Sequence, residues 1–198
     1  MNNRPYRMCY HYYGPVDNTK TILLTEPVCL WLARMCVGEG GSLCTKEHAS
    51  LLIATVINRY LLHKYWRAWK DFVVFLRAFS QPINPRWAQG GDLVLKQLKR
   101  AKTDKAKQDI QKRIARRERI IKTDWAGVPR GVSDAIEEYR QPGYKEQLAV
   151  RTINFASYKG VDKKNKGFWY DGNYFIVDPK MTEEGEVHMF PVYPVMEE

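Results

Sequence analysis

The sequence predicts a mainly α-helical α+β protein with a small β hairpin or sheet near its C-terminus. Helical patterns of apolar residues fill most of residues 25–122. Asp171-Gly172 lies between two aromatic runs, 168–170 and 174–177, and this arrangement is typical of a hairpin. The chain has 198 residues, of which 44% are hydrophobic. We therefore expect one domain with a single substantial core, or one domain with an elaboration.

The first expected helix follows Thr25, which is a good N-cap, and Pro27 suits its first turn. Residues 28–37 are apolar on nearly every face, which predicts a buried helix. Glycines follow Val37, and we expect them to end the helix there.

The second expected helix begins after Thr45 as its N-cap and carries Glu47 in its first turn. Its predicted buried face repeats at helical spacing and consists of Ala49, Leu52, Ile53, Val56, Ile57 and Tyr60. A third helical stretch, residues 66–76, leads towards Ser80. Trp66 and Trp69 in this region either pack in the core or form a platform for sugar rings.

Residues 93–122 contain no proline or glycine, so we expect one long helix. This segment carries twelve lysines and arginines against three acidic residues, in a chain whose net charge is +10. Its apolar stripe fades after Ala101 and returns at Ile110, so its middle projects from the body or forms half of a helical hairpin. We expect the segment to bind an anionic partner, such as the bacterial cell wall, another virion protein or DNA; the alternative is a solvated helix face. It lacks aromatic residues that would stack on bases, so nucleic acid is not the favoured partner.

The remaining elements complete the expected organisation. Ser133 is expected to cap a short helix at 134–139, and residues 150–157 to form a strand before the hairpin. The predicted divisions are an N-terminal arm at 1–24, a main domain at 25–179, which would carry any active site, with the basic insertion at about 93–122, and a tail at 180–198. His11 lies among tyrosines of the arm, where it either packs or binds a ligand.

One acidic residue has an unusual position. Glu39 lies between Gly38 and Gly40 at the end of a hydrophobic helix. The negative end of the helix dipole and nearby apolar groups both disfavour the carboxylate, so they would raise the pKa of Glu39. A carboxylic acid that stays protonated near neutral pH can act as a general acid. The alternative is an exposed residue in a glycine-rich helix end.

Several short motifs occur in a characteristic order. They are Leu32-Ala33-Arg34, then Gly38-Glu39-Gly40-Gly41, Glu47, Val56-Ile57-Asn58-Arg59, and Ala78-Phe79-Ser80. This order resembles the cell-wall hydrolase family typified by spore cortex-lytic enzymes, over about residues 28–82. The family's Ala-Arg-Gly-Glu after the acid is replaced here by Gly-Gly-Ser-Leu, and the loop needs one extra residue to align Asn58. The basic segment at 93–122 is not part of the family pattern.

The resemblance implies a lysozyme-like fold and cleavage of peptidoglycan between N-acetylmuramic acid and N-acetylglucosamine. It assigns Glu39 as the catalytic acid. A single acid fits a lytic transglycosylase, and a muramidase-type hydrolase is the second choice; Glu47 is either a second carboxylate or an ordinary residue at a helix start. The expected substrate contacts are Glu47, Ser80, Gln81, Asn84, Trp87, Asn154 and Tyr158.

Location and partners follow from composition. The first fourteen residues lack the apolar core of a signal peptide, and no apolar run has the length of a membrane span. We expect a phage-encoded lytic enzyme, made in the host cytoplasm, that reaches the wall as an endolysin or as a virion-associated lysin. The alternative is a non-enzymatic basic virion or DNA-binding protein.

The cysteines do not suggest a bound metal. Cys9, Cys29, Cys36 and Cys44 have no metal-binding spacing, so neither a metal nor another cofactor is expected. Cys29 and Cys36 are expected to be free core thiols, and a Cys9–Cys44 disulfide is an open alternative.

Overall fold

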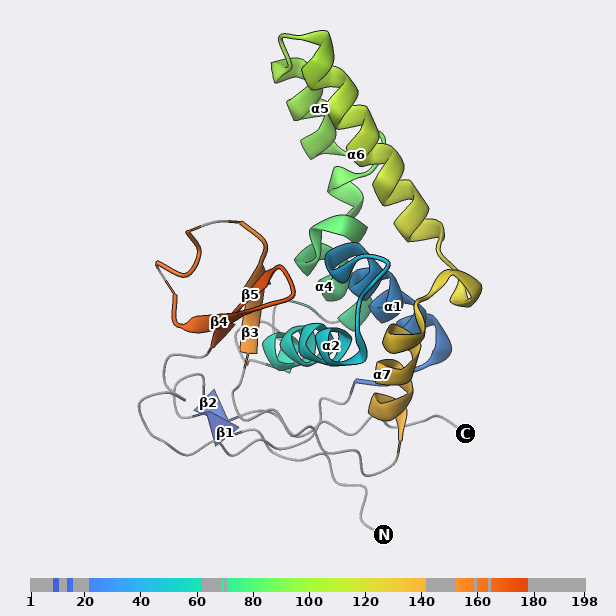
Figure 1. Cartoon of the computed structure of the whole chain (residues 1–198), viewed down its shortest axis with the longest axis vertical. Coiled ribbons are helices and arrows are strands. Elements are labelled where there is room, and N and C mark those ends of the chain that lie inside the picture. The colour runs from blue at the N-terminus through green and yellow to red at the C-terminus, as the bar shows by residue number, and fades with distance from the viewer. Residues whose placement is uncertain are drawn as a thin grey trace.

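The computed structural model of the chain is shown in Figure 1. It describes residues 22–61, 69, 71–141, 152–158, 160–163 and 165–177, together with the backbone of a short antiparallel strand pair, β1 (Cys9–Tyr10) and β2 (Gly14–Pro15). The expectations for His11, for Trp66 and for the tail at 180–198 lie outside the described residues. Within the described part the chain is mainly helical with a small C-terminal sheet. The predicted secondary-structure class is therefore confirmed.

The first helix, α1 (Glu26–Gly40), begins after Thr25 as predicted, with Pro27 in its first turn. Its end differs from the prediction, because the helix continues through Gly38, Glu39 and Gly40. Its C-cap is Gly41, whose φ of 76° is readily adopted only by glycine. Glu39 therefore belongs to the last turn of a helix, which fixes the direction of its side chain.

The second helix, α2 (Lys46–Leu61), is capped as predicted, since the Thr45 hydroxyl accepts a hydrogen bond from the His48 backbone N–H at 3.2 Å. All six residues of its predicted buried face are buried. It packs against α1, against α7 (Arg130–Arg140) and against the sheet. The helix α7 begins four residues earlier than predicted, because its N-cap is Pro129 and not Ser133. Ser133 lies inside the helix, where its hydroxyl donates to the Pro129 carbonyl at 3.5 Å.

The described part of the predicted third helix is α4 (Phe72–Phe79). It begins at Phe72 because the Asp71 side chain accepts a hydrogen bond from the Val74 backbone N–H, which makes Asp71 the N-cap. Two short 3-10 helices follow, η1 (Gln81–Ile83) and η2 (Pro85–Trp87). Trp69 packs against the core, partly buried.

The basic segment is a helical hairpin and not one long helix. It consists of α5 (Asp92–Arg100) and α6 (Asp104–Lys122), and it projects from the rest of the molecule (Figure 1). The chain breaks at 101–103 because Thr103 caps α6 by accepting from the Ala106 backbone N–H at 3.2 Å. Val94, Ile110 and Ile114 form a small core of the hairpin, separate from the main core. The C-terminal half of α6 rests on α1 and η1.

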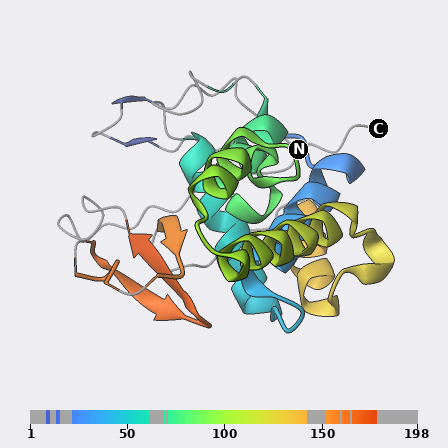
Figure 2. The same ribbon diagram turned by 90° about the horizontal axis from the view of Figure 1, so that it is seen from above.

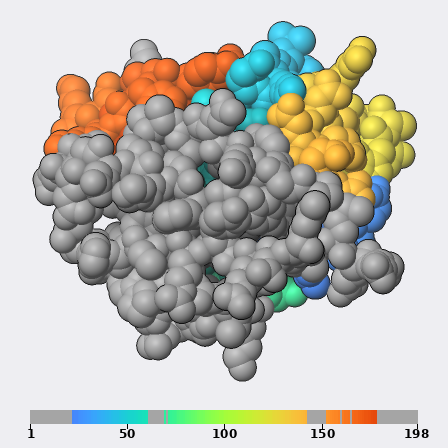
Figure 3. Space-filling view, turned by 90° about the horizontal axis from the view of Figure 1, so that it is seen from below, coloured from blue at the N-terminus to red at the C-terminus, as the bar shows by residue number. Residues whose placement is uncertain are grey.

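The sheet has three antiparallel strands in the order β3-β5-β4, namely β3 (Thr152–Ala156), β5 (Asn173–Val177) and β4 (Gly167–Tyr170). The predicted hairpin is confirmed: Asp171 and Gly172 have φ angles of 42° and 79° and join Tyr170 to its partner Asn173. Viewed from above, the sheet lies to one side of the basic hairpin (Figure 2). Viewed from below, the sheet, α2 and α7 follow one another along an edge of the molecule (Figure 3).

A short 3-10 helix, η3 (Trp125–Gly127), connects α6 to α7. Among the helices that the structure describes, none combines the length and the apolar character needed to cross a bilayer.

Candidate active site

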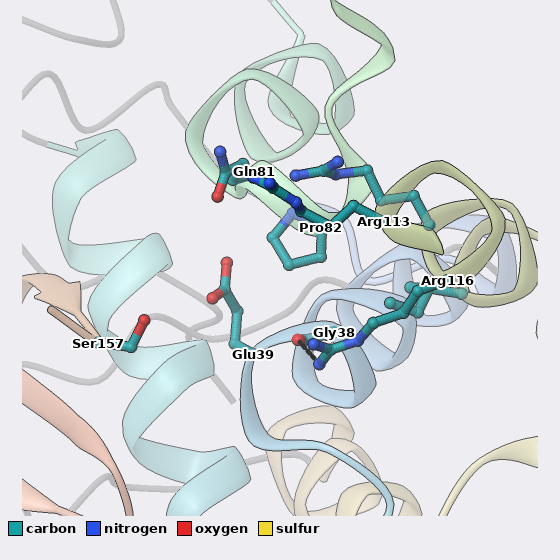
Figure 4. A pocket seen from close by; sticks show the side chains of 9 residues that line it. Gly38, Glu39, Gln81, Pro82, Arg113, Arg116 and Ser157 are labelled. Carbon is teal, nitrogen blue, oxygen red and sulfur yellow. Dashed lines mark hydrogen bonds between the residues drawn. The ribbon is translucent and has the colours of Figure 1, made fainter. Parts of the chain in front are cut away.

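Glu39 lies beside a cavity of about 390 Å³. The cavity is lined by Gly38, Glu39, Gln81, Pro82, Arg113, Arg116, Arg117, Ile120 and Ser157. These residues come from the end of α1, from η1, from the C-terminal half of α6 and from the residue after β3. In Figure 4 the Glu39 side chain extends from the end of α1 between Ser157 on one side and Pro82 on the other. The carboxyl group therefore faces a space that a ligand can occupy.

Among the described residues, the Ser80 side chain is the one that forms a hydrogen bond with the Glu39 carboxyl. The Ser80 hydroxyl donates to Glu39 Oε1 at 2.7 Å, and Ser80 itself is fully buried. Ser80 is the C-cap of α4 and directly precedes η1, so its position is set by two elements of the core. This bond fixes one carboxyl oxygen and leaves the other without a hydrogen-bond partner among the described residues.

Burial raises the pKa of Glu39 above its ordinary value. Two weaker influences oppose this shift, namely the hydrogen bond from Ser80 and the positive charge of Arg116. The direction agrees with the sequence-based expectation that the pKa is raised. A carboxyl group with a raised pKa in a cavity is suited to proton donation.

Two glycines of α1 allow other segments to pack closely against the end of this helix. A Cβ atom at Gly38 would overlap the ring of Pro82, and one at Gly40 would overlap the side chain of Cys44. These close contacts explain why the helix carries glycine on both sides of Glu39. The lack of a side chain at Gly38 lets the segment that holds Ser80 and Gln81 approach the helix that holds Glu39.

A buried polar network lies behind Glu39. The His48 side chain is fully buried, and its Nδ1 lies 2.9 Å from Asp171 Oδ2. Its Nε2 lies 3.1 Å from Asn173 Nδ2, which also lies 3.5 Å from the Glu39 backbone carbonyl. His48 thus contacts Asp171 through one ring nitrogen and Asn173 through the other. The network ties the hairpin turn to α2 and to the end of α1.

Three motif residues hold the structure together away from the cavity. Arg34 Nε donates to the Thr123 carbonyl at 2.9 Å, which joins α1 to the end of α6. Asn58 Nδ2 donates to the Thr152 carbonyl at 3.1 Å, and Arg59 Nη1 donates to the Ile153 carbonyl at 3.1 Å. The Asn-Arg pair thus fastens the first strand of the sheet to the end of α2.

Of the predicted substrate contacts, Ser80 and Gln81 are brought to Glu39. Trp87 does not line the cavity. It lies next to it, since the guanidinium of the lining residue Arg117 is 5.4 Å from the centre of the Trp87 ring. Asn84 has a structural role: its side chain donates to the Ala78 carbonyl and accepts from the Arg86 backbone N–H.

The other three predicted contacts do not line the cavity. Glu47 is exposed on the first turn of α2. Asn154 accepts a hydrogen bond from its neighbour, the Phe155 backbone N–H, at 3.0 Å. Tyr158 is 64% exposed and follows Ser157, which does line the cavity.

Sequence reasoning missed two parts of the site. It predicted Arg113, Arg116 and Arg117 only as members of a basic segment, whereas they line the cavity. Their spacing on one helix face was a visible signal, but nothing local placed that face against Glu39. His48 was also missed, because its partners Asp171 and Asn173 are 123 and 125 residues away.

The described cysteines and potential metal ligands do not form a reactive centre beside Glu39. Cys29, Cys36 and Cys44 are free and buried, so Cys44 forms no disulfide. Burial raises the pKa of Cys44 to about 12, which keeps it protonated and unreactive. No cluster of three or more potential metal ligands occurs among the residues whose placement is described.

No family model, no curated protein and no solved structure matches this chain.

Proposed function

We propose that this protein is a peptidoglycan-degrading glycosidase with a lysozyme-like fold, which cleaves the β-1,4 bond between N-acetylmuramic acid and N-acetylglucosamine. The observation that carries the proposal is the Glu39 carboxyl, which has a raised pKa, accepts one hydrogen bond from Ser80 and faces a cavity. The order of motifs between residues 28 and 82 supports the same activity.

The chemistry follows from one acid. Protonated Glu39 donates its proton to the glycosidic oxygen as the bond to C1 of the muramic acid breaks. Glu39, now a carboxylate, removes the proton of the C6 hydroxyl of the same sugar. The C6 oxygen bonds to C1, which gives a 1,6-anhydro product and returns Glu39 to its protonated form. The reaction consumes no water.

The lack of a second acid among the described residues that line the cavity favours a lytic transglycosylase over a hydrolase. Glycosidases that use water commonly place two carboxylates on either side of the bond. Glu39 is the only acidic residue among the described residues that line this cavity. Glu47, the other motif glutamate, is exposed on α2 and does not line it.

The substitution Glu39→Gln tests the proposal on purified cell wall. It removes the proton donor and keeps the shape of the side chain, so we expect lysis to fall by about 100-fold or more. Glu47→Gln is the matched control, and we expect it to keep wild-type lysis within a few-fold. Mass spectrometry of the released fragments should show anhydro ends. Lysis by Glu39→Gln close to the wild-type rate would contradict the assignment.

The projecting basic hairpin favours a second candidate, a non-enzymatic virion or DNA-binding protein. Such a protein would retard DNA in a salt-dependent gel shift and would leave peptidoglycan intact. The cavity beside Glu39 would then have no catalytic role. The assay of lysis on purified cell wall therefore distinguishes the two candidates.

A further inference from the structure

Three arginines form one wall of the cavity beside Glu39. Arg116 and Arg117 lie three and four residues after Arg113 along α6, so each shares a helix face with Arg113. All three line the cavity, together with Glu39 from α1. Figure 4 shows Arg113 and Arg116 on the α6 side of the cavity, with Ser157 on its far side. We call these three residues the arginine face.

The positive charge of the arginine face is not neutralised by the described residues. None of the three arginines forms an ion pair with a described acidic residue. Arg113 Nε donates to the carbonyl of Asp109 in its own helix, and Arg116 Nη2 donates to the Gly38 carbonyl at 3.4 Å. Glu39 offsets less of this charge than an exposed carboxylate would, because burial raises its pKa.

Arg117 is the most constrained of the three. Its guanidinium lies over the ring of Trp87, and its Nε is buried without a hydrogen-bond partner. Burial lowers the pKa of Arg117, and the charges of Arg113 and Arg116 lower it further. Three guanidinium groups that repel one another, one with an unused buried donor, make an anion the complementary ligand.

We infer that the arginine face is an anion subsite that binds a free carboxylate of the peptide attached to the muramic acid, while the glycosidic bond lies at Glu39. The inference rests on the proposed function and adds what the enzyme recognises. Planar guanidinium groups bind carboxylates through paired hydrogen bonds, which a neutral glycan cannot provide. The protein would therefore prefer peptide-bearing wall with ionised carboxylates to a neutral glycan such as chitin.

The test measures binding with cleavage switched off. The Glu39→Gln protein is titrated with purified wall stripped of phosphate polymers, and with the same wall after its carboxylates have been converted to neutral amides. We expect amidation to weaken binding by about tenfold or more. In the same background, the triple substitution Arg113→Gln, Arg116→Gln and Arg117→Gln should bind both walls equally weakly.

A matched triple substitution controls for net charge. Lys102→Gln, Lys105→Gln and Lys112→Gln remove the same charge from exposed positions of the hairpin that do not line the cavity. This protein should still distinguish native from amidated wall. Arg113→Gln alone guards against a folding defect, since the hydrogen bond that Arg113 donates among the described residues lies within its own helix. It should reduce the preference several-fold.

The results that would overturn the anion subsite differ from those that would overturn the proposed function. Equal binding of native and amidated wall by the Glu39→Gln protein would overturn the inference, as would equal losses in the two triple variants. If stripping the phosphate polymers, and not amidation, abolishes binding, the ligand is a phosphate and the inference is wrong. Failure of the proposed function would appear differently, as wild-type protein that releases no fragments from the wall.

Discussion

The side chain of Glu39 shows how local surroundings select a chemical role. The same residue type at position 47 is exposed on a helix start, where its charge is favourable. At position 39 the carboxyl is partly buried at the end of a helix, and burial is the largest influence on its pKa. Ser80 opposes that influence by donating to the charged form. The pKa of Glu39 is set by the balance of burial against the hydrogen bond from Ser80 and the positive charge of Arg116.

Substituting Ser80→Ala should move the activity profile towards higher pH. The Ser80 hydrogen bond lowers the pKa of Glu39, so its removal raises that pKa further. Under the proposed mechanism, lysis requires protonated Glu39 and should fall as the pH rises through this pKa. The alkaline limb of the lysis profile should therefore shift upward in Ser80→Ala, as measured on purified wall from about pH 4 to pH 9. A limb that moves to lower pH would contradict this account of the Ser80 bond.

At the scale of single elements, the β4–β5 hairpin joins two strands of the sheet and also contacts α1 and α2. Its two turn residues both have positive φ angles, and the Asp171 carboxylate reaches His48 on α2. Asn173, the first residue of β5, contacts both His48 and the Glu39 backbone carbonyl. The conformation of the turn is thus linked to the end of the helix that carries Glu39.

The substitution Gly172→Ala should destabilise the protein by about 1 kcal/mol, because alanine resists the left-handed conformation. A Cβ atom at this position meets no other atom within 4 Å, so the loss would report backbone strain and not a clash. Gly172→Asn is the control, since asparagine tolerates positive φ and should cost less. Urea unfolding measures both. Equal losses in the two variants would show that the turn conformation is not the cause.

The sequence predicted those features that short stretches determine. Thr45 and the apolar spacing of α2 indicated a helix with the correct buried face, and Asp171-Gly172 indicated the hairpin. Gly38 misled the prediction of the end of α1, because a glycine with a positive φ ends a helix, whereas Gly38 serves close packing against Pro82. Thr103 gave a visible capping signal, but the continuous helical composition around it favoured one helix over two.

The whole molecule combines a packed body with a projecting cationic hairpin. Most of the net charge of +10 lies in residues 93–122, and the base of that hairpin forms a wall of the cavity. The tertiary contact between α6 and α1 that creates this wall joins segments distant in sequence. No local pattern encodes that contact, so the sequence predicted the acid and the basic segment separately but not their proximity.

Binding to anionic wall should depend strongly on salt. Raising the ionic strength from about 0.1 M to about 1 M shortens the Debye length from about 10 Å to about 3 Å. We expect the affinity of the Glu39→Gln protein for wall to fall by about tenfold or more over this range, as measured by co-sedimentation. Salt-independent affinity would mean that the hairpin charge does not contribute to wall binding.

The close approach of Gly38 to Pro82 has a consequence for the kind of substrate that fits. Any larger side chain at position 38 must push the proline ring outward, and Ser80 and Gln81 precede that ring in the chain. The lack of a side chain at position 38 therefore lets the segment with Ser80 and Gln81 lie close to the helix with Glu39. Under the proposed function, we expect a larger side chain at position 38 to change the size of the glycan that the cavity admits.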